Sequence, residues 1–236
     1  QIGTDGVLSF ISAPDFETAT SVTATVTVTD AAGLTDTQEV TVTVTDENEA
    51  PTITSTTTEF TIAENQTAIP NATITATDVD AGDTLTFEIS NRDLVIDANG
   101  VVSFATAPDF ETTTEAITAT VTVTDAAGLT DKKDVFVIVT DVNDNAPVFT
   151  SSDSANVAEN TTDVVTLTTT DDDTNPTPTV TYSITGGADE DTFEIVDGVL
   201  KFVTAPNFEL DATTYAVEVT ADDGANETPQ TINVTV

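Results

Sequence analysis

Asp141-Val142-Asn143-Asp144-Asn145-Ala146-Pro147 is the stretch around which the rest of the chain is organised. Its Asp, Asn and Pro residues argue against a core position and against a strand, and long alternating segments lie on both sides of it. Its many oxygen atoms are the hard ligands that Ca2+ binds in sets of about 6–8. A shorter version, Asp46-Glu47-Asn48-Glu49-Ala50-Pro51, occurs about 95 residues earlier. The sequence therefore predicts two calcium-filled hinges between repeated β-domains.

The composition excludes several classes of function. The 42 acidic and 4 basic residues give a net charge of −38, which excludes nucleic acid and disfavours an anionic membrane surface as partners. The charge fits a solvated surface, multivalent cation binding, or both. No cysteine or histidine is present, so disulfides, thiolates and imidazole bases are excluded. No apolar run is long enough to insert into a membrane.

Acidic motifs recur in the same order with a period of about 95 residues. We call the three occurrences copy 1, copy 2 and copy 3. The recurring motifs are Asp15-Phe16-Glu17, Asp109-Phe110-Glu111 and Asn207-Phe208-Glu209; Ala63-Glu64-Asn65 and Ala158-Glu159-Asn160; Asp78-Val79-Asp80 and Asp171-Asp172-Asp173; and the single acids Asp30, Asp125 and Asp223.

Between these motifs, apolar residues alternate with threonines. Val22, Ala24, Val26 and Val28 show the pattern in copy 1, and equivalent runs occur in copies 2 and 3. Alternation of this kind predicts strands with one face in a core and one in water. Copies of about 95 residues with about seven short strands predict an all-β chain of tandem Greek-key β-sandwiches. The aromatic residue between the acids, such as Phe110, is predicted to anchor its loop in the core.

The motifs Ala-Glu-Asn, Asp-x-Asp, Asp-x-Glu and Asp-x-Asn-Asp-Asn-x-Pro resemble the calcium signature of cadherin repeats. The resemblance covers the whole chain and implies an elongated rod of three parts: the C-terminal half of a repeat at 1–50, a repeat at 51–145 and a repeat at 146–236. The Asp-Glu-Asn-Glu-Ala-Pro form of the first hinge is similar to repeats of large bacterial surface proteins rather than of animal cadherins. Gln1 at the start also predicts that the chain is a piece of something larger.

The resemblance implies two sets of Ca2+ ligands. The second junction would use Glu64, Asp109, Glu111, Asp141, Asn143, Asp144, Asp171, Asp173 and Asp223 through side chains, and Val142 and Asn145 through backbone carbonyls, for up to three ions. The first junction would use Asp15, Glu17, Asp46, Asn48, Glu49, Asp78, Asp80 and Asp125. It has a hinge one residue shorter, with Glu49 in place of the usual Asp, so full occupancy is not expected there.

Without metal, the eight carboxylates of the second junction repel one another, at about 4 kcal/mol for a pair about 4 Å apart at an effective dielectric near 20. Bound Ca2+ would fix the angle between neighbouring repeats. The predicted function is therefore an extracellular spacer or adhesion element of a cell-surface protein or fibre. The alternative is a binding module for a polysaccharide or for like repeats on another cell. Carboxylates repeated at domain ends do not suit a single active site, so no enzyme is predicted.

The first 50 residues hold only the later strands of a sandwich and are expected to expose half a core. Two explanations stay open. One is a fragment boundary, and the other is completion of the half-domain by a neighbouring chain within a fibre.

Overall fold

The computed structural model describes residues 1–113, 116–174 and 177–236, and β-strands form almost all of its regular structure. The chain divides into two compact units. One comprises Gln1–Phe60, Ala68–Ala105 and Thr118–Phe136, and the other comprises Thr61–Thr67, Thr106–Ile117 and Val137–Val236. The helical structure in the described residues is a single 3-10 turn, η1 (Glu190–Thr192), and no helix there is long and apolar enough to cross a bilayer. The predicted all-β fold is confirmed.

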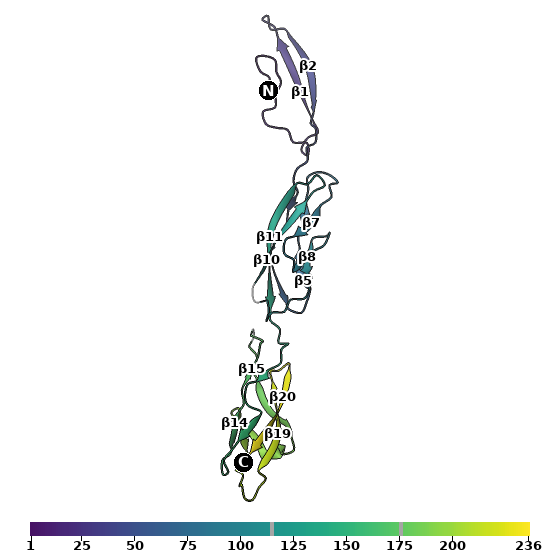
Figure 1. Cartoon of the computed structure of the whole chain (residues 1–236). Helices are drawn as coiled ribbons and strands as arrows, with labels where there is room; N and C mark the ends of the chain where they lie inside the picture. Colours follow the sequence, from purple (N-terminus) through teal and green to yellow (C-terminus); the bar gives the residue numbers. More distant parts are fainter. Residues whose placement is uncertain (114–115, 175–176) are drawn as a thin grey trace. The chain divides into compact units, whose positions relative to one another are not determined.

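Copy 1 forms a hairpin whose apolar side chains stay largely exposed. Strands β1 (Ser21–Thr29) and β2 (Thr35–Thr43) pair in antiparallel register and form a two-stranded sheet by themselves (Figure 1). Val22 is 39% exposed and Val28 66% exposed. The first 50 residues were expected to expose half a core, and this face is exposed because no further strand joins the hairpin in the described residues.

Copy 2 contains a four-stranded sheet, a three-stranded sheet and a short two-stranded one. Their strand orders are β4-β11-β10-β7, β5-β9-β8 and β3-β6. The first two sheets together supply the predicted seven strands. The strands are β3 (Thr52–Ile53), β4 (Glu59–Ala63), β5 (Ala68–Thr73), β6 (Ala76–Thr77), β7 (Thr86–Ile89), β8 (Leu94–Ile96), β9 (Val101–Phe104), β10 (Ile117–Thr124) and β11 (Thr130–Thr140).

The turn between β8 and β9 depends on its final glycine. Gly100 has φ +77°, and a Cβ built on it would lie 2.0 Å from the carbonyl oxygen of Ile74. The approach is this close because the Ile74 amide donates to the Gly100 carbonyl at 2.8 Å. Asp97 completes the turn by accepting hydrogen bonds from the amides of Asn99 and Val101, each at 2.8 Å. A turn is therefore present at 97–100.

Copy 3 repeats this arrangement with the sheet orders β13-β20-β19-β16, β14-β18-β17 and β12-β15. Its core includes Leu200, Val217, Val219 and Ile232, all 0% exposed. The strands are β12 (Val148–Phe149), β13 (Ser154–Asn156), β14 (Asp163–Thr166), β15 (Thr169–Thr170), β16 (Thr181–Gly186), β17 (Phe193–Val196), β18 (Val199–Phe202), β19 (Thr214–Asp222) and β20 (Glu227–Thr235).

Alternating burial along the long strands places the acidic motifs at strand ends. In β10 the apolar residues from Ala119 to Val123 are buried while the intervening threonines are half-exposed. The strand ends at Thr124, so Asp125 follows directly, and Asp141 follows β11 in the same way. The fold thereby gathers acids at the ends of its sheets.

Candidate metal centre

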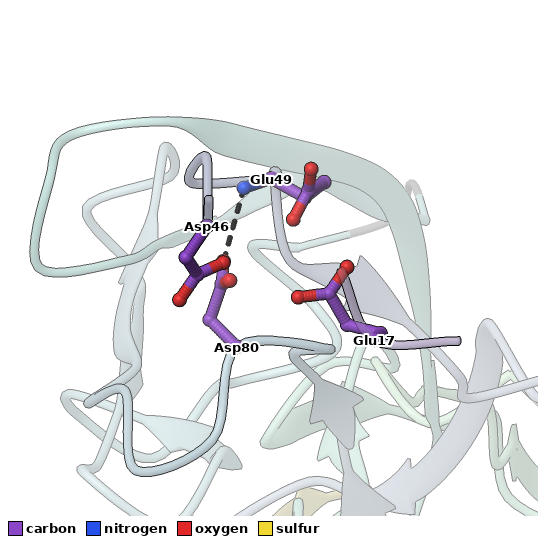
Figure 2. Close-up of side chains that lie close together, drawn as sticks. All are labelled: Glu17, Asp46, Glu49 and Asp80. Carbon is purple, nitrogen blue, oxygen red and sulfur yellow. Dashed lines mark hydrogen bonds between the residues drawn. The ribbon is translucent and has the colours of Figure 1, made fainter. Parts of the chain in front are cut away.

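The first acidic site lies in the unit that contains Gln1, and four of its carboxylates gather around one space. One oxygen from each of Glu17, Asp46, Glu49 and Asp80 lies within 4.8 Å of the other three (Figure 2). The Glu49 amide donates to Oδ2 of Asp80 at 3.0 Å, which ties the hinge to the Asp-x-Asp loop. Glu49, the residue in place of the usual Asp, thus brings its carboxylate into the group.

A second group in this site includes an acid that the sequence analysis missed. Asp83 lies with Asp78 and Asp80, and its Oδ1 accepts a hydrogen bond from the Ala126 amide at 3.3 Å. Asp80 and Asp83 line part of a hollow of about 540 Å3 together with Asp46. The feature of the sequence that could have identified Asp83 is its position in the same acidic loop, directly after Gly82.

Asp125 is buried but is not part of a carboxylate group in the described residues. It is 5% exposed and accepts hydrogen bonds from Nδ2 of Asn48 and from the Leu129 amide. Burial alone raises the pKa of Asp125, but the hydrogen bonds from Asn48, Leu129 and Gly128 lower it below the ordinary value. Asn48 therefore connects the hinge to the acid that follows β10.

The second acidic site lies in the unit that contains Val236, and its carboxylates form three overlapping groups. The groups are Glu64, Glu111 and Asp141; Glu111, Asp144 and Asp173; and Asp171, Asp173 and Asp223. Because Glu111 and Asp173 are each shared by two groups, the three groups form a continuous series. All seven acids were predicted as ligands of this junction.

Glu64 is, with Asp173, one of the two most buried acids of this site. It is 2% exposed, and its two oxygens accept hydrogen bonds from the Phe110 amide at 2.6 Å and the Val142 amide at 2.8 Å. Glu64 therefore joins the Asp-Phe-Glu loop to the hinge. Asn65, with φ 62°, turns the chain directly after it and donates through Nδ2 to Asp144.

Amide side chains connect the hinge to the acids of copy 3. Asn145 donates through its backbone amide to Oδ2 of Asp173 at 3.1 Å and through Nδ2 to Oδ1 at 3.2 Å. Asn226, which sequence reasoning missed, donates through Nδ2 to the Asn145 carbonyl at 2.9 Å and to Oδ1 of Asn143 at 3.1 Å. In the swapped orientation of its side-chain amide, Asn143 donates instead to Oδ2 of Asp173 and of Asp223, each at 3.2 Å. The side chains of Asn143, Asn145 and Asn226 therefore hold the hinge against these acids.

The first acids of the two Asp-Phe-Glu motifs lie outside these carboxylate groups in the described residues. Oδ1 of Asp15 accepts the Glu17 amide at 3.0 Å, and Oδ1 of Asp109 accepts the Glu111 amide at 3.1 Å. Both aspartates hold the local turn that presents the glutamate. Val142 contributes the amide bonded to Glu64 and is itself 39% exposed.

Buried oxygens without hydrogen-bond partners test whether these residues suit a cation. In the described part of the chain, Oδ2 of Asp78, Oδ1 of Asp80, Oε1 of Glu111 and Oδ2 of Asp171 are buried and accept no hydrogen bond. Such groups cost free energy unless they are paired or coordinate a metal. Carboxylate and amide oxygens are also the ligand types that Ca2+ prefers. The donor set therefore fits Ca2+.

Burial, neighbouring charges and hydrogen bonds shift the pKa of several acids in the two sites. Burial raises the pKa of Glu49, Glu111 and Asp171 above the ordinary value, and the charge of a neighbouring acid raises each further. Burial also raises the pKa of Asp223, but hydrogen bonds from the amides of Asn226 and Ala225 lower it below the ordinary value.

We therefore expect the calcium-stripped chain to become more stable as the pH falls from 7 toward the ordinary values of 4.5 for Glu and 3.8 for Asp. Groups with a raised folded pKa bind protons in the folded state before the unfolded state does, so folding gains stability in that window. Below it, the contributions of Asp125 and Asp223 are lost as their carboxylates protonate. Thermal unfolding of stripped protein across this range measures the effect, and a melting temperature that only falls from pH 7 downward would contradict it.

The comparisons with known proteins agree with the resemblance seen in the sequence. Residues 48–138 match the family described as "Bacterial Ig domain". The structure superposes on mouse cadherin-23 EC22-24 with a TM-score of 0.74 and 23% identity, over 95% of this chain and 77% of that one. The chain has a cadherin-like fold. The protocadherin GammaB4 extracellular domain also matches, with a TM-score of 0.72 and 24% identity, over 100% of this chain and 41% of that one.

A curated relative is similar to this chain in sequence. The "Protocadherin-like wing polarity protein stan" of Drosophila melanogaster is 31% identical over 186 residues, which is 71% of this chain. The chain spans only 5% of that relative's length. One match is thus to a bacterial family and the other to an insect protein.

Proposed function

We propose that these cadherin-like repeats form a calcium-rigidified extracellular segment that extends a surface protein or fibre. The observation that carries this proposal is the continuous series of carboxylate groups from Glu64 to Asp223, which contains buried oxygens without partners. A stretch of copy 2, the hinge and loops of copy 3 all contribute oxygens to that series. A cation bound there would interact with all three at once. The bacterial source and the partitioning into 1–50, 51–145 and 146–236 belong to this proposal.

Bound Ca2+ would supply positive charge that neutralises the converging carboxylates. The chain's own residues do the rest: Glu64 holds the hinge against the Asp-Phe-Glu loop, and Asn145 and Asn226 hold it against the acids of copy 3. These hydrogen bonds bring the oxygens of the loops together, and the ion would then fix the angle between neighbouring repeats. The less buried first site, in which Glu17, Asp46 and Glu49 are all exposed, should bind more weakly.

Small-angle scattering of the whole chain tests the proposed stiffening. In about 10 mM Ca2+, well above the roughly 0.1–1 mM dissociation constants of extracellular calcium modules, we expect a single rigid particle. With excess chelator, repulsion between the carboxylates should broaden the distribution of interatomic distances. Equal concentrations of Mg2+ serve as the control, because Mg2+ requires near-octahedral geometry and dehydrates reluctantly. Identical curves with Ca2+ and with chelator would overturn the proposal.

The alternative function also places the repeats outside the cell. In it, the repeats bind a glycan or like repeats on another cell. The protocadherin gammaB7 EC3-6 fragment, which is 22% identical to this chain with a TM-score of 0.69, is described as a cis-dimer. Association with a second chain would be compatible with the spacer role. Sedimentation of the chain at increasing concentration in Ca2+ measures it.

A further inference from the structure

Copy 3 contains a hollow that uses none of the predicted calcium ligands. It has a volume of about 390 Å3 and lies where the end of β18 meets the start of β19. The residues that matter here are Tyr215, Phe202 and Val203, with Asp191 and Asp211 as the acids that line it. Its volume is within the range of about 300–1,000 Å3 that is usual for ligand sites.

The ring of Tyr215 is held in a fixed orientation. It meets Phe202 edge-on, with ring centroids 5.0 Å apart and planes at 74°, and Phe193 at 6.1 Å and 89°. Phe202 is 2% exposed, whereas Tyr215 is only partly buried and lines the hollow. Burial raises the pKa of Tyr215 above the ordinary value, and the charges of Asp211 and Asp189 raise it further. An aromatic ring in a negative field is an attractive site for a cation.

The two acids of the hollow do not form a metal site. In the described residues, neither Asp191 nor Asp211 belongs to a set of three acidic side chains with oxygens within 4.8 Å of one another. Asp211 already accepts the Asn207 amide at 2.8 Å through Oδ2. Two carboxylates beside an aromatic ring suit an organic cation, which has an extended apolar surface as well as a charge.

The hollow differs from the equivalent place in copy 2 at several positions. Strand register aligns Leu94 with Phe193, because they pair with Phe104 and Phe202 respectively. The Ala-Pro motifs align the loops that follow. The resulting changes from copy 2 to copy 3 are Arg92 to Asp191, Ala105 to Val203, Thr112 to Leu210, Thr113 to Asp211 and Ile117 to Tyr215. A basic residue is thus replaced by an acid, and an aromatic residue, an acid and larger apolar residues are introduced.

We propose that this hollow binds the cationic end of an Arg or Lys side chain from a partner protein. The charge would lie over the Tyr215 ring, between the carboxylates of Asp191 and Asp211. Val203 is 57% exposed and Leu210 is 82% exposed, so they offer apolar contacts for the residues of the partner around that side chain. The net charge of −38 would also steer a basic partner toward the chain.

The probe is N-acetyl-arginine amide, titrated into the 15N-labelled whole chain in 10 mM CaCl2 and followed by the amide resonances around Asp211 and Ala216. We expect saturable shifts in these resonances. The matched neutral probe, N-acetyl-citrulline amide, has nearly the same shape without the charge and should bind at least about fivefold more weakly. Equal binding of the two probes, or tighter binding of a neutral oligosaccharide at the same resonances, would overturn the proposal.

Variants that restore neutral or copy 2 residues test the assigned roles. Asp191→Asn combined with Asp211→Thr should weaken arginine-amide binding at least about fivefold, and Tyr215→Ile should do the same. Tyr215→Phe keeps the ring and should stay within about twofold. The charge control is Asp153→Asn with Glu227→Gln, two exposed acids, of which Glu227 pairs with Asp222 at the other end of β19 from Tyr215. If this control weakens binding as much as the Asp191 and Asp211 pair, only general charge is involved and the site is wrong.

Discussion

Removing calcium is expected to lower the melting temperature of the chain by about 5–10 °C. A site with a dissociation constant near 0.1 mM, in about 10 mM Ca2+, adds about 2.7 kcal/mol to the folded state. For a chain of this size, each kcal/mol changes the melting temperature by about 2–4 °C. The carboxylate series from Glu64 to Asp223 is the proposed source of this effect, because chelation would remove the positive charge beside its buried oxygens.

Calorimetry with Ca2+, with chelator, and with Ca2+ restored after chelation measures the change. Restoring Ca2+ should recover the full melting temperature, whereas Mg2+ at the same concentration should recover a smaller part. A control with added NaCl at matched ionic strength separates specific binding from general screening of the net charge of −38. If NaCl alone gives the same stabilisation as Ca2+, the acidic sites are solvated surfaces and the calcium proposal fails.

Glu64→Ala is expected to destabilise the chain by about 2–6 kcal/mol in Ca2+. The substitution leaves the amides of Phe110 and Val142 without their acceptor, at about 1–3 kcal/mol each, and also removes a proposed ligand. The matched control is Glu159→Ala in copy 3. Glu159 has the same Ala-Glu-Asn motif, but it is only half-buried and accepts one longer hydrogen bond, from the Phe208 amide at 3.2 Å. Its loss should cost less than about 1 kcal/mol.

Urea unfolding in Ca2+ and in chelator distinguishes the two roles of Glu64. If Glu64 only accepts backbone hydrogen bonds, its removal costs the same free energy in both solutions. If it also binds Ca2+, the cost is larger in Ca2+, because the variant gains less from the ion. Glu64→Gln gives a further check, since it keeps one acceptor oxygen and removes the charge. An equal cost in the two solutions would remove Glu64 from the set of ligands.

The strands and the acid groups were largely predictable from local patterns. Apolar residues at every second position have to face one side of a strand, so the buried face of β10 follows from the sequence. The positions of Asp125 and Asp141 directly after β10 and β11 also follow from the sequence, because carboxylates are disfavoured among apolar core residues. The resemblance to cadherin repeats, rather than the alternation, assigned Glu111, Asp173 and Asp223 to one site.

The sequence by itself determined the strand pattern, the period of about 95 residues and the type of ligand atom at each hinge. Only the tertiary structure decided that Glu64 is buried while Glu159, in the same motif, is half-buried. It also brought Asp83 and Asn226 into the sites and left Asp15 and Asp109 as turn acceptors. The physical reason is that burial and hydrogen bonding depend on which distant segments meet, whereas periodicity and ligand chemistry depend on neighbouring residues alone.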